Sequence, residues 1–257
     1  MLRLIVILPL FVCTLGNPFP KGHGLSNRGI IGGNYAKGGQ FPYQLNLQLR
    51  NTHICGASLI ALNVALTAAH CTYKENHKKL NVIAGSIDRH NGGKRIFVDR
   101  VEEHKRFKPA IHDYDIAILF LEESFVPGPT IRVIALPTSK EVIPPNSYAT
   151  VSGWGGDQPT RDDTGTHTKF LKFVNIPIWK SSDCLPYHEE LTSDVYCGGI
   201  ESGLENACAG DSGSPLVYKN KLFGLVIYGH GCGTPNEPVV YLNVASYRTW
   251  ISRKANI

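Results

Sequence analysis

The sequence predicts an all-β fold with closed barrels, and two observations support this. Short runs rich in Val, Ile, Leu and Phe recur along the chain, separated by Gly, Pro, Asn and Asp. This pattern is typical of short strands joined by turns. Helical periodicity is convincing only near the C-terminus. Many strands with almost no helix favour an all-β architecture closed into barrels.

The expected strands are runs of four to eight apolar-rich residues between turn residues. They are Tyr43–Leu49, Asn81–Gly85, Arg95–Val98, Asp115–Leu121, Lys169–Ile176, Leu222–Tyr228 and Val239–Val244. A terminal helix is expected from Val244 to Ile251, capped by Ser246. The Pro-rich stretch Ile143–Asn146 suggests that the chain crosses between two halves near residues 140–150.

The first 29 residues predict export and processing. Arg3 precedes an apolar run from Leu4 to Leu15, and Gly16 offers a cleavage point, so residues 1–16 are expected to be a signal peptide. The run is shorter than the roughly twenty residues that a membrane-spanning helix needs. Residues 17–29 hold two prolines and three glycines, as in an exposed activation propeptide. We therefore expect a secreted, extracellular protein that does not reside in a membrane.

The remaining residues, 30–257, are expected to form one all-β unit of paired barrels. The chain has a net charge of +5, but its first 29 residues contribute three positive charges and no negative ones, so the rest carries +2. This small charge argues against a nucleic-acid partner.

The cysteine count predicts disulfides. Cys13 leaves with the signal peptide, and six of the seven cysteines remain. An even number in an oxidising compartment favours three disulfides over free thiols. The sequence contains neither a CxxC pair nor an HExxH motif, so we expect no metal site and no cofactor.

Three segments hold the groups needed to hydrolyse an amide: a nucleophile, a base and a group that orients the base. Ser212 lies in the segment GDSGSP, whose glycines allow a sharp turn that aims the Gly210 and Ser212 N–H groups at one point, as an oxyanion hole does. His70 lies in LTAAHC, where small residues and a cysteine would hold the imidazole. Asp115 heads the apolar run DIAIL, where a buried carboxylate could orient a histidine.

With these motifs in the order His, Asp, Ser, the sequence resembles the trypsin and chymotrypsin family, and in particular its secreted invertebrate-type members with three disulfides. The resemblance covers Ile30 to about Ile251 and includes the segments IIGG, GWG and the final Trp250 and Ile251. It implies two six-stranded antiparallel barrels and a C-terminal helix. It also implies a serine endopeptidase, with protein or peptide substrates.

The resemblance further implies roles for individual residues. Ser212 would attack the scissile carbonyl, His70 would transfer the proton, and Asp115 would orient His70. Cleavage would free an amine at Ile30, which would pair with Asp211 and activate a zymogen. The implied partners are an activating protease and protein inhibitors of proteases, and the active form would be a monomer. The implied disulfides are Cys55–Cys71, Cys184–Cys197 and Cys208–Cys232.

The residues expected to form the substrate pocket depart from the tryptic pattern. Tryptic members carry an aspartate six residues before the nucleophile, where this chain has Asn206. Val239 replaces a glycine of the pocket wall, whereas Gly229 is retained. A substrate Arg or Lys would lose its counter-ion, so we expect cleavage after uncharged residues of small or medium size.

Two further departures touch the catalytic machinery. Ile227 replaces a serine whose hydroxyl supports the triad aspartate in the family. Ser214 replaces the second glycine of the usual GDSGGP, and its Cβ would strain the turn if its φ were positive. In the stretch that matches the family's calcium loop, Ser86–Lys94, only Asp88 carries a carboxylate, so no calcium is expected. These changes leave an alternative open, namely a catalytically impaired protease-like protein that acts by binding another protein.

Overall fold

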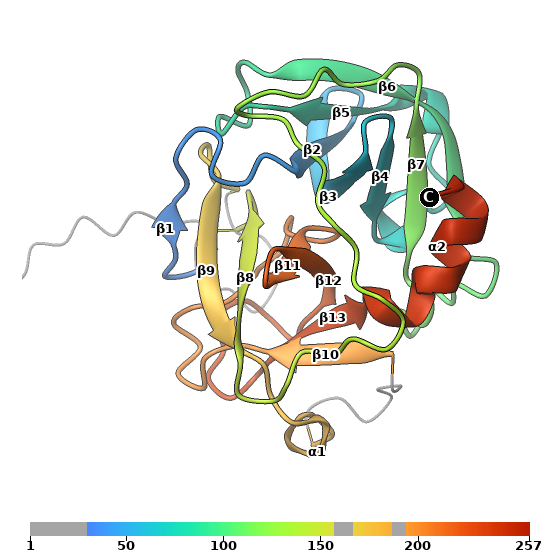
Figure 1. Cartoon of the computed structure of the whole chain (residues 1–257). Helices are drawn as coiled ribbons and strands as arrows, with labels where there is room; N and C mark the ends of the chain where they lie inside the picture. Colours follow the sequence, from blue (N-terminus) through green and yellow to red (C-terminus); the bar gives the residue numbers. More distant parts are fainter. Residues whose placement is uncertain (1–29, 157–166, 187–193) are drawn as a thin grey trace, which may run out of the picture.

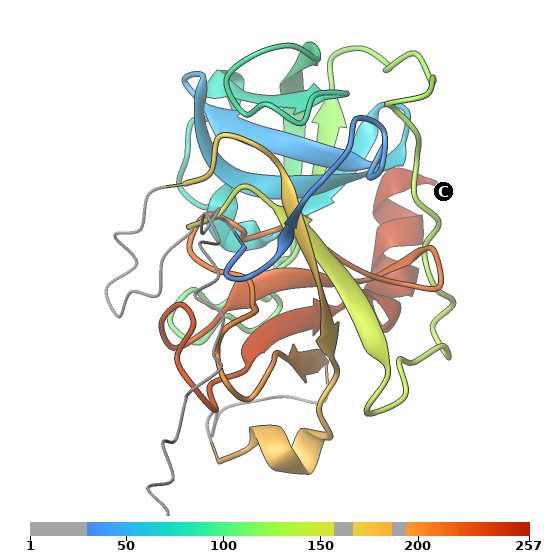
Figure 2. The same cartoon turned by 90° about the vertical axis from the view of Figure 1, so that its left-hand side faces the viewer.

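The computed structural model describes residues 30–156, 167–186 and 194–257. The expected signal peptide and propeptide, residues 1–29, lie outside the described residues. The described chain is all-β, with a closed six-stranded barrel, a second sheet and a short C-terminal helix (Figure 1). In Figure 2 the barrel lies above the second sheet, and the segment after Ile30 passes between them.

The first half of the chain forms the barrel, with the strand order β2-β3-β4-β7-β6-β5. These strands are β2 (Gln44–Leu49), β3 (Thr52–Ala61), β4 (Val64–Thr67), β5 (Leu80–Ala84), β6 (Lys94–Glu103) and β7 (Ala117–Leu121). In β6, Ile96 and Val98 are buried, whereas Arg95 and Phe97 are exposed. This alternation is the two-residue period of a strand with one face on a core.

The second half forms a seven-stranded antiparallel sheet with the order β1-β9-β8-β11-β12-β13-β10. Its strands are β1 (Asn34–Tyr35), β8 (Tyr148–Gly153), β9 (Lys172–Pro177), β10 (Val195–Gly198), β11 (Pro215–Tyr218), β12 (Lys221–Tyr228) and β13 (Val239–Asn243). The expected second barrel is therefore not closed by continuous strand pairing. An isolated bridge between Ile178 and Gly198 brings the ends of β9 and β10 together, so the sheet is strongly curved.

The chain changes from barrel to sheet earlier than the Pro-rich stretch suggested. The amide of Ile134 donates to Leu59 of the barrel, whereas Ala135 bridges to Lys221 of the sheet. The crossing thus lies at residues 134–135, and residues up to 147 then run along the sheet before β8 begins.

The C-terminal helix begins with the 3-10 turn η3 (Val244–Tyr247) and continues as α2 (Arg248–Ala255). Its cap is Asn243 and not Ser246, because the Asn243 side chain accepts the amide of Ala245 at 3.1 Å. The helix packs beside β7, as Figure 1 shows. None of the helices in the described ranges is long and apolar enough to cross a membrane.

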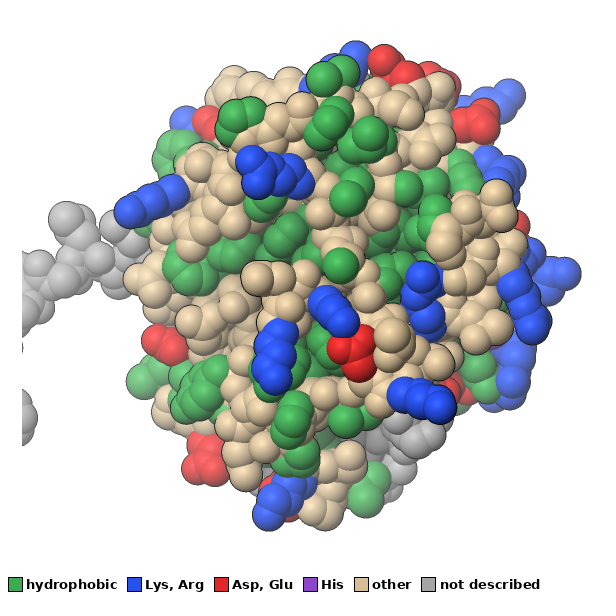
Figure 3. Space-filling view, in the orientation of Figure 1, with side chains coloured by type: hydrophobic (Ala, Val, Ile, Leu, Met, Phe, Trp, Pro, Cys, Tyr) green, Lys and Arg blue, Asp and Glu red, His purple; other side chains and the backbone are tan. Residues whose placement is uncertain are grey.

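The three disulfides expected from the resemblance are present: Cys55–Cys71, Cys184–Cys197 and Cys208–Cys232. The first ties β3 to the turn that carries His70, and the second ties α1 (Ser181–Cys184) to β10. On the face in Figure 3, lysine and arginine side chains are spread over the surface, with acidic side chains near several of them.

Candidate functional site

His70 lies in a 3-10 turn, η1 (Ala69–Cys71), directly after β4. Ala68 and Ala69 are fully buried, because their small side chains let the turn pack against the barrel, and Cys71 fixes its end through the disulfide to Cys55. The His70 side chain is 23% exposed. The turn therefore presents the imidazole at the edge of the barrel.

Asp115 precedes β7 and is fully buried. Its Oδ1 accepts the backbone N–H of His70 at 2.8 Å, and its Oδ2 lies 2.6 Å from His70 Nδ1. Burial by itself would raise the pKa of Asp115. The hydrogen bonds from His112 and His70, together with the charge of His70, lower it by more, so the pKa lies below its ordinary value. The ionised carboxylate can only accept hydrogen bonds, so the His70 proton sits on Nδ1 and leaves Nε2 as an acceptor.

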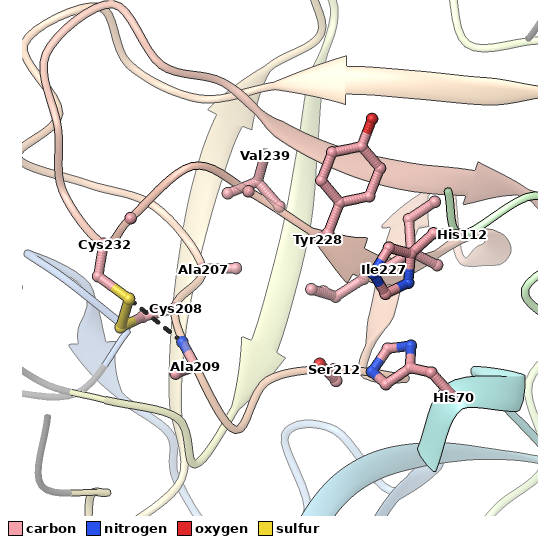
Figure 4. A pocket seen from close by; sticks show the side chains of 13 residues that line it. His70, His112, Ala207, Cys208, Ala209, Ser212, Ile227, Tyr228, Cys232 and Val239 are labelled. Atoms are coloured by element: carbon pink, nitrogen blue, oxygen red, sulfur yellow. Dashed lines mark hydrogen bonds between the residues drawn. A yellow bond between two sulfur atoms is a disulfide. The ribbon is translucent and has the colours of Figure 1, made fainter. Parts of the chain in front are cut away.

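Ser212 lies in the loop between β10 and β11, at the same end of the pocket as His70, and the two side chains face each other in Figure 4. Gly210 and Gly213 have φ values of 87° and 71°. A Cβ on Gly213 would come within 2.2 Å of Thr67 Oγ1, so the tight turn requires glycine there. The Ser212 carbonyl accepts the amide of Gly56 at 2.8 Å, which anchors the loop to the barrel.

Ser214 does not strain this loop, because its φ is not in the positive range. Its backbone N–H donates to the Asp211 carbonyl at 2.9 Å. Its hydroxyl, however, is fully buried and has no hydrogen-bond partner among the described residues. The departure from the family's glycine therefore adds an unsatisfied polar group and leaves the backbone unstrained.

The pocket beside Ser212 is lined by the neighbouring strands β12 and β13 and by the loops at residues 207–209 and 229–232 (Figure 4). Among the described residues it is lined by His70, His112, Ala207, Cys208, Ala209, Ser212, Val226, Ile227, Tyr228, Gly229, Gly231, Cys232 and Val239. None of these side chains carries a carboxylate or an ammonium group. A Cβ on Gly229 would lie 3.2 Å from Val239 Cγ2, so Val239 already narrows the space beside Gly229.

Asn206 is not among the described residues that line this pocket. Its side chain is buried, and its Oδ1 accepts the amide of Ala207 at 3.0 Å. Its backbone forms an isolated bridge with Ile31. The side-chain oxygen of Asn206 is thus used within the fold, and its neighbour Ala207 lines the pocket.

The residues predicted for activation are both fully buried. Ile30 has a φ of 28°, a conformation that β-branched residues rarely adopt. The Asp211 carboxylate accepts the amides of Gly155 at 2.8 Å and Cys208 at 3.0 Å. Burial raises the pKa of Asp211 to about 7, although these two hydrogen bonds and the charge of Lys172 lower it.

The Asp211 carboxylate lies so close to Gly153 and Gly155 of the segment GWG that a side chain at either position would clash with it. A Cβ on Gly153 would come within 2.0 Å of Asp211 Oδ1, and one on Gly155 within 2.4 Å of Oδ2. These positions therefore let the backbone approach the carboxylate closely.

Three residues near the site escaped the sequence analysis. His112 Nδ1 lies 3.0 Å from Asp115 Oδ2, and His53 Nε2 lies 3.0 Å from the Gly210 carbonyl oxygen. Lys172 is fully buried, and its ammonium lies 3.2 Å from the Ile30 carbonyl. For Lys172, the sequence showed only a lysine inside the expected strand Lys169–Ile176. For His53 and His112, an isolated histidine in the sequence does not indicate which groups it will contact.

Among the described residues, His70, His112 and Asp115 place atoms that could ligate a metal within 4.8 Å of one another. The Nδ1 protons of both histidines are directed at the carboxylate, so a cation would have to displace them. Cys55 and Cys71, which also lie near His70, are joined in a disulfide and cannot act as thiolate ligands. We assign no metal to this site.

Comparison with known proteins shows one family. The family model described as Trypsin matches residues 30–251. Trypsin delta of Drosophila erecta is 34% identical over 262 residues, which cover 99% of this chain and 100% of that protein. Trypsin alpha of Drosophila melanogaster is 34% identical over 263 residues, covering 100% of this chain and 99% of that protein. Trypsin alpha-4 of Lucilia cuprina matches at the same identity.

Proposed function

The chain belongs to the trypsin family of serine proteases, and we propose that it is a secreted endopeptidase, made as a zymogen, that cleaves after uncharged residues of small or medium size. His70, Asp115 and Ser212 act as its catalytic triad. The observation that carries the catalytic part is the 2.6 Å contact between His70 Nδ1 and a fully buried Asp115 carboxylate, with Ser212 facing the same imidazole.

The reaction proceeds through an acyl-enzyme. Ser212 Oγ attacks the carbonyl carbon of the scissile bond, and its proton passes to His70 Nε2. The carbonyl π electrons move onto the oxygen, which the Gly210 and Ser212 amides stabilise. The C–N bond then breaks, the leaving amine takes the proton from His70, and an ester to Ser212 remains. Water, activated by His70 in the same way, hydrolyses this ester and restores Ser212.

Two contacts support the oxyanion role of the Gly210 peptide. Within the described segments, neither the Gly210 nor the Ser212 amide donates a backbone hydrogen bond. His53 lies against the Gly210 carbonyl, and its other ring nitrogen lies 2.8 Å from Asn46 Oδ1. These contacts support an orientation in which the Gly210 N–H is left free for a substrate oxygen.

The relatives are named trypsins, so the proposed preference depends on this chain's own pocket. The described lining of the pocket holds no carboxylate, and the adjoining residue Asn206 is buried and uncharged. A substrate Arg or Lys would place an unpaired cation against Val226 and Val239, and burying an unpaired charge costs several kcal/mol. An uncharged side chain of modest size avoids this cost.

Activation is proposed to produce an N-terminus at Ile30. Arg28 is followed by Gly29, so cleavage after Arg28 leaves one extra residue and displaces the amine by about 3.5 Å. A buried ion pair with Asp211 does not tolerate such a displacement. Productive processing therefore cuts after Gly29 or trims it, which requires an activator with non-tryptic preference.

Activity of the processed protein, compared with its Ser212→Ala and His70→Ala variants, tests the catalytic proposal. Wild-type protein should show a burst of acyl-enzyme formation and amide hydrolysis, and each variant should be slower by a factor on the order of 10⁴. Equal residual rates in all three proteins would instead support the binding function considered above.

A further inference from the structure

The buried carboxylate of Asp115 has a second imidazole donor. Its Oδ2 lies 2.6 Å from His70 Nδ1 and 3.0 Å from His112 Nδ1. An ionised carboxylate offers about four acceptor sites. Burial raises the pKa of Asp115, and the hydrogen bonds from His112 and His70 together with the charge of His70 bring it below its ordinary value. Both histidines therefore donate Nδ1–H to the same oxygen.

His112 is held in this position by its backbone and by its ring. Its φ of 51° places it in the left-handed region, which turns the chain and directs the side chain back to Asp115 three residues later. Its ring stacks on Tyr228 with centroids 5.3 Å apart and meets the His70 ring edge-on at 5.2 Å. The side chain is 31% exposed, so it is fixed between β12 and the catalytic histidine without being enclosed.

The side chain of Ile227, next to Tyr228, cannot donate a hydrogen bond to Asp115. Ile227 is buried in β12, lines the same pocket as His112 and has no polar side-chain atom. Figure 4 shows Ile227 and His112 at neighbouring positions on the wall above Ser212 and His70. Ile227 therefore offers no donor to the carboxylate, whereas His112 does.

We propose that His112 is a positioning residue for catalysis. Its Nδ1–H holds the Asp115 carboxylate ionised and aligned, and Asp115 in turn orients His70 toward Ser212. This role depends on the proposed function, because it acts through the triad. The same ring also forms part of the pocket wall, so contact with substrate and support of Asp115 must be separated by experiment.

The test uses processed protein and three variants. His112→Leu removes the donor at similar volume, and His112→Asn keeps an N–H donor near the place of Nδ1. His112→Leu with Ile227→Ser supplies a hydroxyl from β12 instead. Each is measured for kcat and KM on one small ester substrate, and the His70 Nδ1–H proton is followed by NMR in ¹⁵N-labelled protein.

We expect His112→Leu to lower kcat by about 10- to 100-fold, the range for losing a hydrogen bond to a charged group, with KM changed less than threefold. Its His70 Nδ1–H signal should shift or broaden. His112→Asn should retain most of kcat, and Ile227→Ser should restore at least part of the loss.

The proposal is overturned if His112→Leu keeps the wild-type kcat and the wild-type Nδ1–H signal, or if it changes KM alone. It is also overturned if both His112→Asn and the double variant are folded but as slow as His112→Leu. The NMR signal does not require turnover, so wild-type protein without an acyl-enzyme burst would contradict the proposed function and leave this hydrogen bond testable.

Discussion

The side-chain oxygen of Asn206 accepts the backbone N–H of Ala207 at 3.0 Å, and Ala207 lines the pocket whereas Asn206 is buried outside its lining. The position that could place a charge under a substrate side chain is thus occupied by an amide that bonds to its own loop. Val239, the first residue of β13, narrows the pocket beside Gly229. Both residues must change if the pocket is to accept a long cationic side chain.

The first prediction is that Asn206→Asp combined with Val239→Gly shifts cleavage toward Arg. The aspartate supplies a counter-ion and the glycine opens the path to it, so kcat/KM for Arg over Leu substrates should rise by about two decades or more. A peptide library and matched chromogenic substrates measure this ratio. Asn206→Asp alone is the control and should change the ratio little, because Val239 still stands in the way. A wild-type enzyme that already prefers Arg would contradict the proposed specificity.

The second prediction concerns the activation site. Deleting Gly29 places Arg28 directly before Ile30, so trypsin treatment should activate the deletion variant and leave the wild-type protein largely inactive. N-terminal sequencing and active-site titration of both products provide the measurement. Asp211→Asn in the deletion variant should abolish the activity gained on trypsin treatment, while the protein remains folded. Full activity in wild-type material that begins at Gly29 would rule out the proposed Ile30–Asp211 pair.

The third prediction follows from the raised pKa of Asp211, about 7 in the uncleaved chain. An unfolded aspartate has a pKa near 3.9, so the folded chain holds this proton more tightly. The free energy by which this bound proton stabilises the folded chain is fully present below about pH 4. It is lost as the pH rises toward 7. Relative to Asp211→Asn, the uncleaved protein should therefore lose a few kcal/mol of unfolding free energy over this range.

Denaturant titrations at several pH values test this third prediction. Asp211→Asn serves as the control, because it is similar in shape and does not titrate, so the other carboxylates cancel in the difference. In processed protein the Ile30 ammonium should favour the ionised carboxylate and shrink the effect. A difference that stays constant from pH 4 to pH 7 would show that Asp211 does not hold a proton in the uncleaved chain.

The fourth prediction concerns the hydroxyl of Ser214, which is buried and has no partner in the described structure. Ser214→Ala removes an unsatisfied polar group and keeps the Cβ, so the free energy of unfolding should rise by about 1 kcal/mol. Activity should remain within a few-fold of wild type. Ser147→Ala offers a comparison substitution, because Ser147 is half-buried just before β8 and its side chain hydrogen-bonds to Tyr218. A clear loss of stability in Ser214→Ala would indicate that the hydroxyl makes a hydrogen bond in solution.

Local sequence patterns were sufficient for much of the fold. Apolar runs between turn residues located seven of the strands to within a few residues. The short strands β1, β4, β10 and β11 were missed, and so were the longer β3 and β8, in which small and polar residues interrupt the apolar pattern. The pattern also could not show that the second sheet stays open, since strand closure depends on pairing between distant residues such as Ile178 and Gly198.

For the candidate site, the sequence by itself determined which residue types are present and where the backbone must turn. The glycines around Ser212 and the alanines before His70 act locally, so their effect can be inferred from neighbours in the chain. Only the tertiary structure decided that Asn206 is buried, that Lys172 is buried against Ile30, and that His112 donates to Asp115. Each of these depends on direction and burial, which arise when the barrel and the sheet pack together and which no local spacing encodes.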